Sequence, residues 1–330
     1  MIMKIAVLGG SGFVGSKLIE ILFHSEIFQI LNIDKQQSTR YPEITRIADV
    51  LDKEVMQTLL QGIDLVVLLA AEHRDDVKPT SLYYDVNVNG MQCTLEAMEK
   101  NAVKRIIFTS TVAIYGLDKN NPNENTPADP FNHYGKSKWK AEQLLQEWYK
   151  THEDWNINVI RPTVIFGERN RGNVYNLLNQ IASGKFIMIG KGNNRKSMSY
   201  IGNVVAFILF LILHKERGYN VYNYVDKPDF TTNDLVLNTG EALDRRIPTI
   251  YIPYFLGLLG GYGFDVLAWL LQKKLSISSV RVKKFCAVTE YDSNSVLSSG
   301  FQPPYTIVEG LKSTLKAEFG NKVIENGTGR

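Results

Sequence analysis

The chain has 330 residues, enough for one large domain or two closely associated ones, and its 44% hydrophobic and 22% charged residues are ordinary for a globular protein. Its net charge of +3 is too small to indicate a nucleic-acid partner. The two cysteines and five histidines are scattered without metal-ligand spacing, so we expect free thiols, a reducing cytoplasmic compartment and no metal site. We also expect no secretory signal, because the first apolar run soon meets Gly9.

The N-terminal segment carries a glycine pattern. Met3–Leu8 is an apolar run that predicts a buried parallel strand, and a helical pattern extends from Ser16 to about Phe23. Between them the glycines follow the spacing Gly9-x-x-Gly12-x-x-Gly15. A strand, glycine turn and helix in this order favour a dinucleotide site, where backbone amides approach a pyrophosphate at the helix N-terminus. The alternative is a glycine-rich loop that binds nothing.

Two acidic residues follow the next strands. A second strand, Phe28–Ile33, ends in Asp34, whose carboxylate can accept hydrogen bonds from the adenosine ribose hydroxyls. It would repel a 2′-phosphate, so we expect NAD rather than NADP. Asp49 follows a third short strand, where it could reach the adenine amino group. The alternative for Asp34 is a helix cap or a solvated loop position.

Strand and helix patterns continue to alternate. The predicted elements are a strand at 64–71 ending in small residues, a helix at 83–100 that contains Asn87, a strand at 105–110 leading into Thr111, and a strand at 156–160 closed by residues 161–167. The Thr111 hydroxyl, at a strand's carboxyl end, faces the crevice where open α/β sheets bind ligands. The alternation predicts an α/β fold with a doubly wound parallel sheet of Rossmann type.

A tyrosine and a lysine are the candidate base. Tyr134 and Lys138 are four residues apart in a segment that reads as helix as far as about His152, so they share one helix face. A lysine charge favours phenolate, and work near pH 7 needs a shift of roughly three units from the free tyrosine pKa of about 10. The alternative is a surface helix with a chance tyrosine–lysine pair.

Taken in order, these motifs resemble the extended short-chain dehydrogenase/reductase superfamily, in its sugar-nucleotide epimerase branch. Arg161-Pro162 through Gly167, Gly190-Lys191-Gly192 and residues 299–303 after Asp292 extend the match over nearly the whole chain. Residues 69–77, 132–139, 168–178, 196–198, 222–228 and 278–286 further resemble the bacterial epimerases that interconvert GlcNAc and GalNAc on undecaprenyl diphosphate, in O-antigen and lipopolysaccharide synthesis.

The resemblance implies roles for particular residues. The catalytic group is Tyr134, Lys138 and Thr111. The NAD-binding residues are Gly9, Gly12, Phe13, Val14, Gly15, Asp34, Asp49, Val50, Leu69, Ala70, Ala71, Asn87, Tyr134, Lys138, Pro162 and Thr163. The substrate contacts are Thr111, Asn173, Val174 and Arg195, with Arg195 facing a diphosphate. The alternative for Arg195 is a solvated side chain in a polar loop.

The implied domain organisation is not linear. Residues 1–167 are expected to form the NAD-binding domain, with segments near 204–226 and 286–300 returning to it or its edge. Residues 168–203 and 227–319 are expected to form a smaller α/β substrate domain, and 320–330 a flexible tail.

The implied reaction is a 4-epimerisation through a 4-keto sugar, with Tyr134 as the base. The 4,6-dehydratases of this fold place Asp-Glu directly after the active-site threonine, and its decarboxylases use a glutamate at the second of these positions. Val112 and Ala113 stand there and cannot move a proton. Two alternatives remain: a soluble UDP-GlcNAc or UDP-glucose 4-epimerase, and a non-catalytic NAD-binding protein.

One long apolar segment bears on the membrane. Tyr251–Leu271 holds a single charge, Asp265, and basic residues flank it at Arg245, Arg246, Lys273, Lys274, Arg281, Lys283 and Lys284. Its length permits a span, but the later motifs should pack back on the same domain. We therefore expect a monotopic contact with the cytoplasmic leaflet of the inner membrane. The alternatives are a buried core segment and a dimer contact, and the resemblance allows a homodimer. Val204–Leu213 predicts a buried helix.

Overall fold

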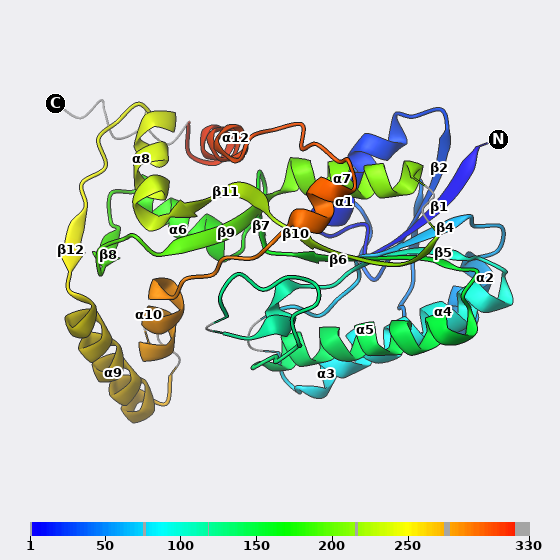
Figure 1. The fold of residues 1–330 in the computed structure, drawn as a ribbon, viewed down its shortest axis with the longest axis horizontal. Coiled ribbons are helices and arrows are strands. Elements are labelled where there is room, and N and C mark those ends of the chain that lie inside the picture. Colours follow the sequence, from blue (N-terminus) through cyan, green and yellow to red (C-terminus); the bar gives the residue numbers. More distant parts are fainter. Residues whose placement is uncertain (1, 75–76, 118, 215–216, 274–277, 321–330) are drawn as a thin grey trace. The chain divides into compact units, whose positions relative to one another are not determined.

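The computed structural model describes residues 2–74, 77–117, 119–214, 217–273 and 278–320 (Figure 1). Asp75, Asp76, Lys274 and the expected tail beyond Gly320 lie outside these residues. The chain divides into two compact units. Unit 1 comprises residues 1–163, 201–225 and 291–304, and unit 2 comprises 164–200, 226–290 and 305–330. The domain boundaries expected from the sequence stay a prediction, because compactness alone does not show which segments fold together.

Unit 1 is built on a seven-stranded sheet in the order β10-β6-β5-β4-β1-β2-β3. The strands are β1 (Met3–Leu8), β2 (Phe28–Asp34), β3 (Thr45–Ile47), β4 (Leu65–Leu68), β5 (Arg105–Thr109), β6 (Asn156–Pro162) and β10 (Gly218–Tyr224). Every neighbouring pair is parallel. The strand order runs outward in both directions from β1, so the prediction of a doubly wound parallel sheet is confirmed.

Helices cover both faces of this sheet. They are α1 (Phe13–Phe23), α2 (Lys53–Leu59), α3 (Ser81–Tyr84), α4 (Gly90–Lys100), α5 (His133–Thr151), α7 (Ile201–Leu213) and the short α11 (Asn294–Ser298). Helices α1 and α7 pack together on one face, and α2, α4 and α5 lie on the other (Figure 1). The central strands β1, β4, β5 and β6 are mostly or wholly buried because both faces are covered, which explains their apolar runs.

Three details differ from or sharpen the sequence-based expectation. The helix predicted at 83–100 begins at Ser81 and contains a π-helical turn, Asp85–Asn89, which includes Asn87. The strand predicted at 64–71 is only Leu65–Leu68, and the residues after it form a loop. The apolar segment Val204–Leu213 lies within α7, most of which is buried, so that prediction is confirmed.

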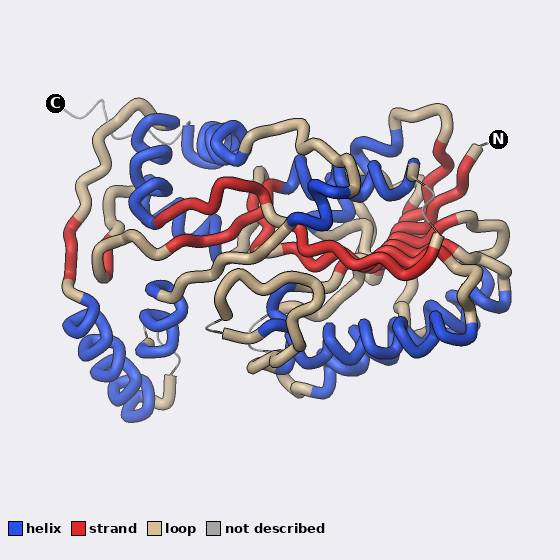
Figure 2. Tube along the Cα trace, viewed as in Figure 1, coloured by secondary structure: helices blue, strands red, loops and turns tan. Residues whose placement is uncertain are grey.

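Unit 2 is a smaller α/β assembly. Its three-stranded sheet has the order β11-β9-β7, from β7 (Val164–Phe166), β9 (Arg195–Tyr200) and β11 (Asp226–Thr231). A parallel pair joins β8 (Ile187–Ile189) to β12 (Ile250–Ile252). The helices are α6 (Asn173–Ala182), α8 (Thr232–Ala242), α9 (Tyr254–Leu271), α10 (Ser279–Cys286) and α12 (Ile307–Phe319). Figure 2 shows how much of this unit is loop.

Candidate active site

The glycine turn is dictated by close backbone approach. Gly9 has φ +85°, and a Cβ there would lie 2.6 Å from the Ala70 amide nitrogen. A Cβ on Gly15 would lie 2.4 Å from the Gly10 Cα. The residues directly after β4 therefore pack closely against the glycine turn, and the turn packs closely against the start of α1. Ala70 and its neighbour Leu69 both donate backbone hydrogen bonds to Leu8, at 2.8 Å, which holds the end of β4 against β1.

Helix α1 begins at Phe13, three residues before the predicted start at Ser16. Its N-cap is Gly12, no side chain caps the first turn, and no acidic residue lies in that turn. The first amides of a helix have no partner inside it, and the helix dipole makes this end positive. The turn thus offers donors to an anion, and the crowded glycines provide a cradle that side chains would fill. These features fit a bound pyrophosphate.

Asp34 is held rigidly beside this turn. One carboxylate oxygen accepts the Ser11 amide and the other accepts the Gln36 amide, each at 2.9 Å. Asp49 accepts the Leu51 amide at 3.0 Å and pairs with the Lys35 ammonium at 3.1 Å. A carboxylate fixed by backbone amides is held in one orientation, as a ribose contact requires. Val50, beside Asp49, is buried.

Thr111 and Tyr134 are brought together by two helix starts. Asn132 caps α5 by accepting the Gly135 amide at 2.8 Å. Thr111 caps the 3₁₀ turn Val112–Tyr115 through its own hydroxyl. A Cβ on Gly135 would lie 2.7 Å from the carbonyl oxygen of Ala113, so the two segments pack without a side chain between them. The outcome is a hydrogen bond between the Thr111 and Tyr134 side chains.

Lys138 is almost wholly buried, with 2% of its surface exposed. Its ammonium nitrogen donates to the Thr109 carbonyl oxygen at 2.7 Å and lies 4.6 Å from the centre of the Phe108 ring. The lysine is therefore anchored at the carboxyl end of β5. Tyr134, one helical turn earlier, is partly exposed.

The pKa direction of Tyr134 in the protein alone is opposite to the one expected from the sequence. Burial raises the pKa of Tyr134 to about 12, against a lowering by the Thr111 hydrogen bond. Burial lowers the pKa of Lys138 to about 7, against a raising by the Glu142 carboxylate. Desolvation penalises phenolate and ammonium alike, and in the protein alone it is the largest influence on the pKa of each group. The expected lowering of the tyrosine pKa by Lys138 is thus wrong for the protein by itself.

Sequence reasoning missed a charged group one turn further along α5. Glu142 is buried and accepts two hydrogen bonds from Arg161 Nε, at 3.1 Å, and one from its terminal nitrogen at 2.6 Å. The Ser110 hydroxyl donates to the same carboxylate. Arg161 also donates to Tyr115 Oη at 2.7 Å. The spacing 134, 138, 142 was the available signal, because it places a carboxylate on the buried face of the catalytic helix.

Asn87 and the end of β6 form hydrogen bonds that hold the loops near Tyr134 and Lys138 in place. The Asn87 amide group accepts from the Glu72 amide at 2.9 Å and donates to the Glu72 carbonyl at 3.0 Å and to Ser137 Oγ at 2.8 Å. It therefore ties the loop after β4, which begins with Leu69 and includes Ala71, to α5. Pro162 ends β6, and the following amide, of Thr163, donates to the Tyr224 carbonyl at 3.1 Å.

The expected substrate residues lie in unit 2. Asn173 and Val174 are the first two residues of α6, which has Gly172 as N-cap and no side-chain cap. Arg195 is the first residue of β9, is mostly exposed, and pairs with the Glu290 carboxylate at 3.3 Å. Both features are suited to an anion: uncapped helix amides and an exposed guanidinium.

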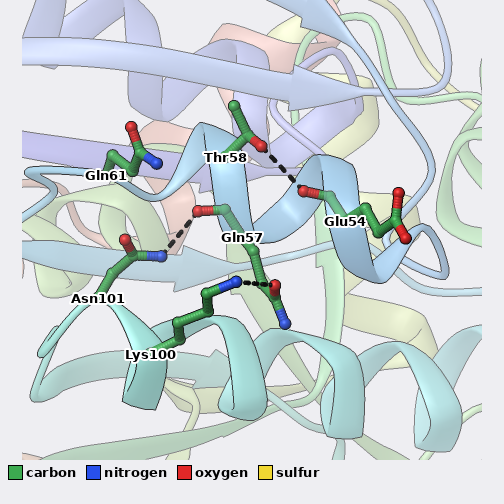
Figure 3. Close-up of a pocket in the computed structure, with 6 residues that line it drawn as sticks. All are labelled: Glu54, Gln57, Thr58, Gln61, Lys100 and Asn101. Carbon is green, nitrogen blue, oxygen red and sulfur yellow. Dashed lines mark hydrogen bonds between the residues drawn. The ribbon is translucent and has the colours of Figure 1, made fainter.

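A surface hollow elsewhere in unit 1 has a different character. It is lined by Glu54, Gln57, Thr58, Gln61, Lys100 and Asn101, at the ends of α2 and α4 (Figure 3). Helices of a doubly wound sheet end near the amino ends of the next strands, away from the edge where ligands bind. Lys100 and Asn101 already donate to Gln57, so the hollow is not part of the candidate site.

The parallel sheet, the glycine turn, the fixed acidic residue and the tyrosine with its buried lysine together define a dinucleotide-dependent enzyme of Rossmann type. Residues 5–224 match the NAD dependent epimerase/dehydratase family. The chain belongs to this family.

The chain is also similar to particular curated proteins. It is 59% identical over 317 residues to the N-acetyl-alpha-D-glucosaminyl-diphospho-ditrans,octacis-undecaprenol 4-epimerase of Escherichia coli O157:H7, covering 96% of this chain and 95% of that one. It is 26% identical to the UDP-glucose 4-epimerase of Vibrio cholerae over 95% of each chain. Among solved structures, the UDP-glucose 4-epimerase of Thermotoga maritima with UDP-glucose has the same fold, with a TM-score of 0.77, 22% identity and coverage of 98% and 100% of the two chains.

Proposed function

We propose that this protein is an NAD-dependent 4-epimerase that interconverts GlcNAc and GalNAc on undecaprenyl diphosphate. The observation that carries the proposal is the 59% identity, over almost the full length of both chains, to a relative named for that reaction. Tyr134, with Thr111 against it and the buried Lys138 one helical turn away, would supply the chemistry that an epimerase of this family needs.

The NAD site of the proposal lies in unit 1. The amides at the start of α1 would hold the pyrophosphate, and Asp34 would accept the adenosine ribose hydroxyls. Asp49 lies near the expected adenine position. Lys138 would hold the nicotinamide ribose. Bound NAD⁺ would supply a reversible hydride acceptor for C4 of the sugar, which gives access to a 4-keto sugar, and epimerisation would require this ketone to turn over in the site before it is reduced.

The protein's own residues move the proton. Tyr134 Oη takes the proton from the sugar O4 as C4 is oxidised, and returns it when the ketone is reduced. Thr111, hydrogen-bonded to Tyr134, orients O4. The tyrosine pKa of about 12 in the protein alone means that ionisation needs a further positive charge. Protonated Lys138, favoured by Glu142, and the charge of oxidised nicotinamide would supply it.

The substrate's diphosphate would meet unit 2. The uncapped amides of Asn173 and Val174 and the guanidinium of Arg195 are its proposed partners. Glu290 already pairs with Arg195, so a diphosphate would compete with this carboxylate.

The direct test offers the purified enzyme two donors, GlcNAc-diphospho-undecaprenol and UDP-GlcNAc. We expect the lipid-linked donor to be converted with a kcat/KM at least tenfold higher. Preference for UDP-GlcNAc would establish the soluble nucleotide-sugar alternative instead, and absence of turnover on either donor would favour a non-catalytic NAD-binding protein.

The membrane is the partner that follows from a lipid-linked substrate. We propose peripheral association with the cytoplasmic leaflet of the inner membrane through Tyr251–Leu271. Among the described residues one helix, α9, is long and apolar enough to cross a bilayer by length and composition. Only Gly261 of its residues is buried, which argues against the alternative of a core segment within unit 2.

A further inference from the structure

Helix α9 has two unlike faces. The covered face consists of Gly257, Gly261, Asp265 and Ala268, with Leu258 beside them, and the remaining side chains are exposed. The largest exposed fractions belong to Phe255 (68%), Leu259 (67%) and Trp269 (71%). Spacings of three and four residues place the covered positions on one side of the helix. The exposed face is therefore a broad apolar surface one helix long.

The covered face receives the neighbouring helix α10 and strand β8. A Cβ on Gly261 would lie 2.8 Å from the Ser279 Cα, and one on Gly257 would lie 2.5 Å from the Ile189 side chain. Asp265, the only charge on α9, accepts the Ser279 amide at the start of α10, at 3.2 and 3.3 Å. The carboxylate is thus turned away from the apolar face. Figure 1 shows α9 and α10 side by side.

The surroundings of this apolar face are basic. Arg245, Arg246, Lys273, Arg281, Lys283 and Lys284 are all exposed, and the Lys283 ammonium lies 5.6 Å from the centre of the Tyr262 ring. An apolar helix face bordered by cations complements an anionic lipid surface, where side chains enter the leaflet and the cations meet headgroups. A second copy of the same surface would bring these cations against one another.

The far end of α10 is tied to the strand that carries Arg195. Lys196 Nζ donates to the carbonyl oxygens of Lys284 and Ala287, at 2.9 and 2.5 Å, and Asn194 donates to that of Phe285 at 2.8 Å. These are C-terminal carbonyls of α10, where a cation is favoured. The two side chains flank Arg195 in the sequence. Helix α10, with eight residues, spans about 12 Å between α9 and this anchor.

We propose that α9 lies in the plane of an anionic phospholipid leaflet on its apolar face, and that α10 acts as a strut that holds Arg195 at headgroup height to receive the substrate diphosphate. This inference rests on the proposed lipid-linked substrate. The diphosphate stays at headgroup height because its charge excludes it from the hydrocarbon. A docked α9 therefore sets the distance between the leaflet and Arg195.

The first experiment measures docking by co-sedimentation with vesicles of phosphatidylglycerol and phosphatidylethanolamine. We expect the triple variant Phe255→Ser, Leu259→Ser, Trp269→Ser to bind at least tenfold more weakly. The matched control, Leu237→Ser, removes a similarly exposed apolar side chain from α8 and should bind as wild type does. The double variant Lys273→Glu, Lys283→Glu, which keeps the apolar face, should lose the preference for anionic over phosphatidylcholine vesicles.

Docking is overturned if wild type stays in the supernatant, or if the triple variant binds as the control does. It is also overturned if wild type at low concentration is a discrete dimer of defined mass and the triple variant is a monomer, because the face then belongs to a second copy.

The second experiment measures depth from quenching of tryptophan by brominated acyl chains. Trp269 is compared with Phe255→Trp and Tyr262→Trp, each placed in a Trp269→Phe background. A helix in the plane gives three similar depths. A markedly deeper Tyr262→Trp reporter would indicate a spanning helix and would overturn the in-plane arrangement.

The third experiment tests the strut with a double-mutant cycle in vesicles that contain the lipid-linked donor. Lys196→Met and Arg195→Ala should each raise KM about tenfold, with a smaller change in kcat and with vesicle binding retained. The double variant should raise KM little more than Arg195→Ala alone does, because Lys196 acts through Arg195. Fully additive effects would overturn the strut.

Failure of the inference and of the proposed function are separable. Wild type that binds anionic vesicles but converts only UDP-GlcNAc keeps the docking and refutes the lipid-linked substrate, and with it the role of Arg195 at headgroup height. Wild type that converts the lipid-linked donor in detergent micelles but ignores vesicles keeps the function and refutes the docking.

Discussion

The phenol of Tyr134 is the residue on which the reaction depends. Tyr134→Phe keeps the ring but removes the group that exchanges a proton with O4, so we expect turnover to fall by at least about 1,000-fold, within the range for loss of an acid–base group. NAD should remain bound, because the glycine turn is untouched. The checks are a coupled epimerisation assay and the NAD content of the purified protein. Undiminished turnover would exclude Tyr134 as the base.

Glu142 is expected to act on the reaction through Lys138. Its carboxylate favours protonated Lys138, so Glu142→Gln lowers the pKa of the lysine further and should move the alkaline limb of the kcat profile to lower pH. Glu147→Gln, an exposed substitution on the same helix, is the matched control. An unmoved alkaline limb would leave Glu142 a purely structural partner of Arg161.

The buried lysine also makes stability depend on pH. The pKa of Lys138 is lowered from 10.5 to about 7, so between these values the unfolded chain binds a proton that the folded one does not, and this group makes stability rise with pH. Below pH 7 the lysine is protonated in both states, and the folded state bears the full free-energy cost of burying the ammonium. Lys138→Met should remove about 3 kcal/mol of the stability gained between pH 7 and 9.5, measured by urea unfolding. Equal gains in both proteins would contradict the lowered pKa.

Among the individual residues, the sequence proposes which ones form the candidate site but not their energetics. Tyr134, Lys138 and Thr111 are recognisable from spacing and from a strand's end. The direction of the pKa shifts is not, because it depends on how much protein surrounds each group. Glu142 and its partner Arg161 are far apart in the chain, and only the fold shows that they meet.

At the scale of elements, the glycine turn and the start of α1 form one unit with the end of β4. Gly15→Ala would place a Cβ against the Gly10 backbone, so α1 must shift. The first amides of α1 would then no longer point at the expected pyrophosphate position. We expect NAD affinity to fall at least about tenfold, measured by isothermal titration. Gly320→Ala, where a Cβ meets open space, should bind as wild type does. Equal affinity in Gly15→Ala would place the cofactor elsewhere.

Element boundaries were the weaker part of the prediction. Helix α1 starts at Phe13 rather than Ser16, since Gly12 can act as N-cap without a side chain. Strand β4 stops at Leu68, because the amides of Leu69 and Ala70 both turn to the Leu8 carbonyl. The π-helical turn around Asn87 has no signature in the apolar pattern. Alternation of buried strands and amphipathic helices was nevertheless enough to fix the fold class of unit 1.

At the scale of the whole molecule, the proposal makes the protein a peripheral membrane enzyme. In cell fractionation we expect it to sediment with membranes and to be released by alkaline carbonate, which strips proteins that do not span the bilayer. A known inner-membrane transporter, retained in the pellet, is the control. Retention of this protein in the carbonate pellet would favour a spanning α9.

Residues 164–200 and 226–290, which make up most of unit 2, were the hardest to predict. Their strands are short and partly exposed, and their course depends on long-range pairs such as Lys196 with the end of α10. The apolar composition of Tyr251–Leu271 is plain in the sequence, but the spacing of its apolar residues alone does not distinguish a buried core helix from an exposed one. The structure decides for exposure because the small residues and Asp265 share the covered side.

That exposed side has a practical consequence at the bench. In protein purified without lipid, the apolar face of α9 from Phe255 to Leu271 is exposed to water. Exposed apolar surfaces associate with one another in water. We therefore expect detergent-free protein to aggregate as its concentration rises, and the aggregates to disperse when a mild non-ionic detergent is added. Light scattering of the wild type beside the serine-substituted triple variant would show whether this face alone is responsible.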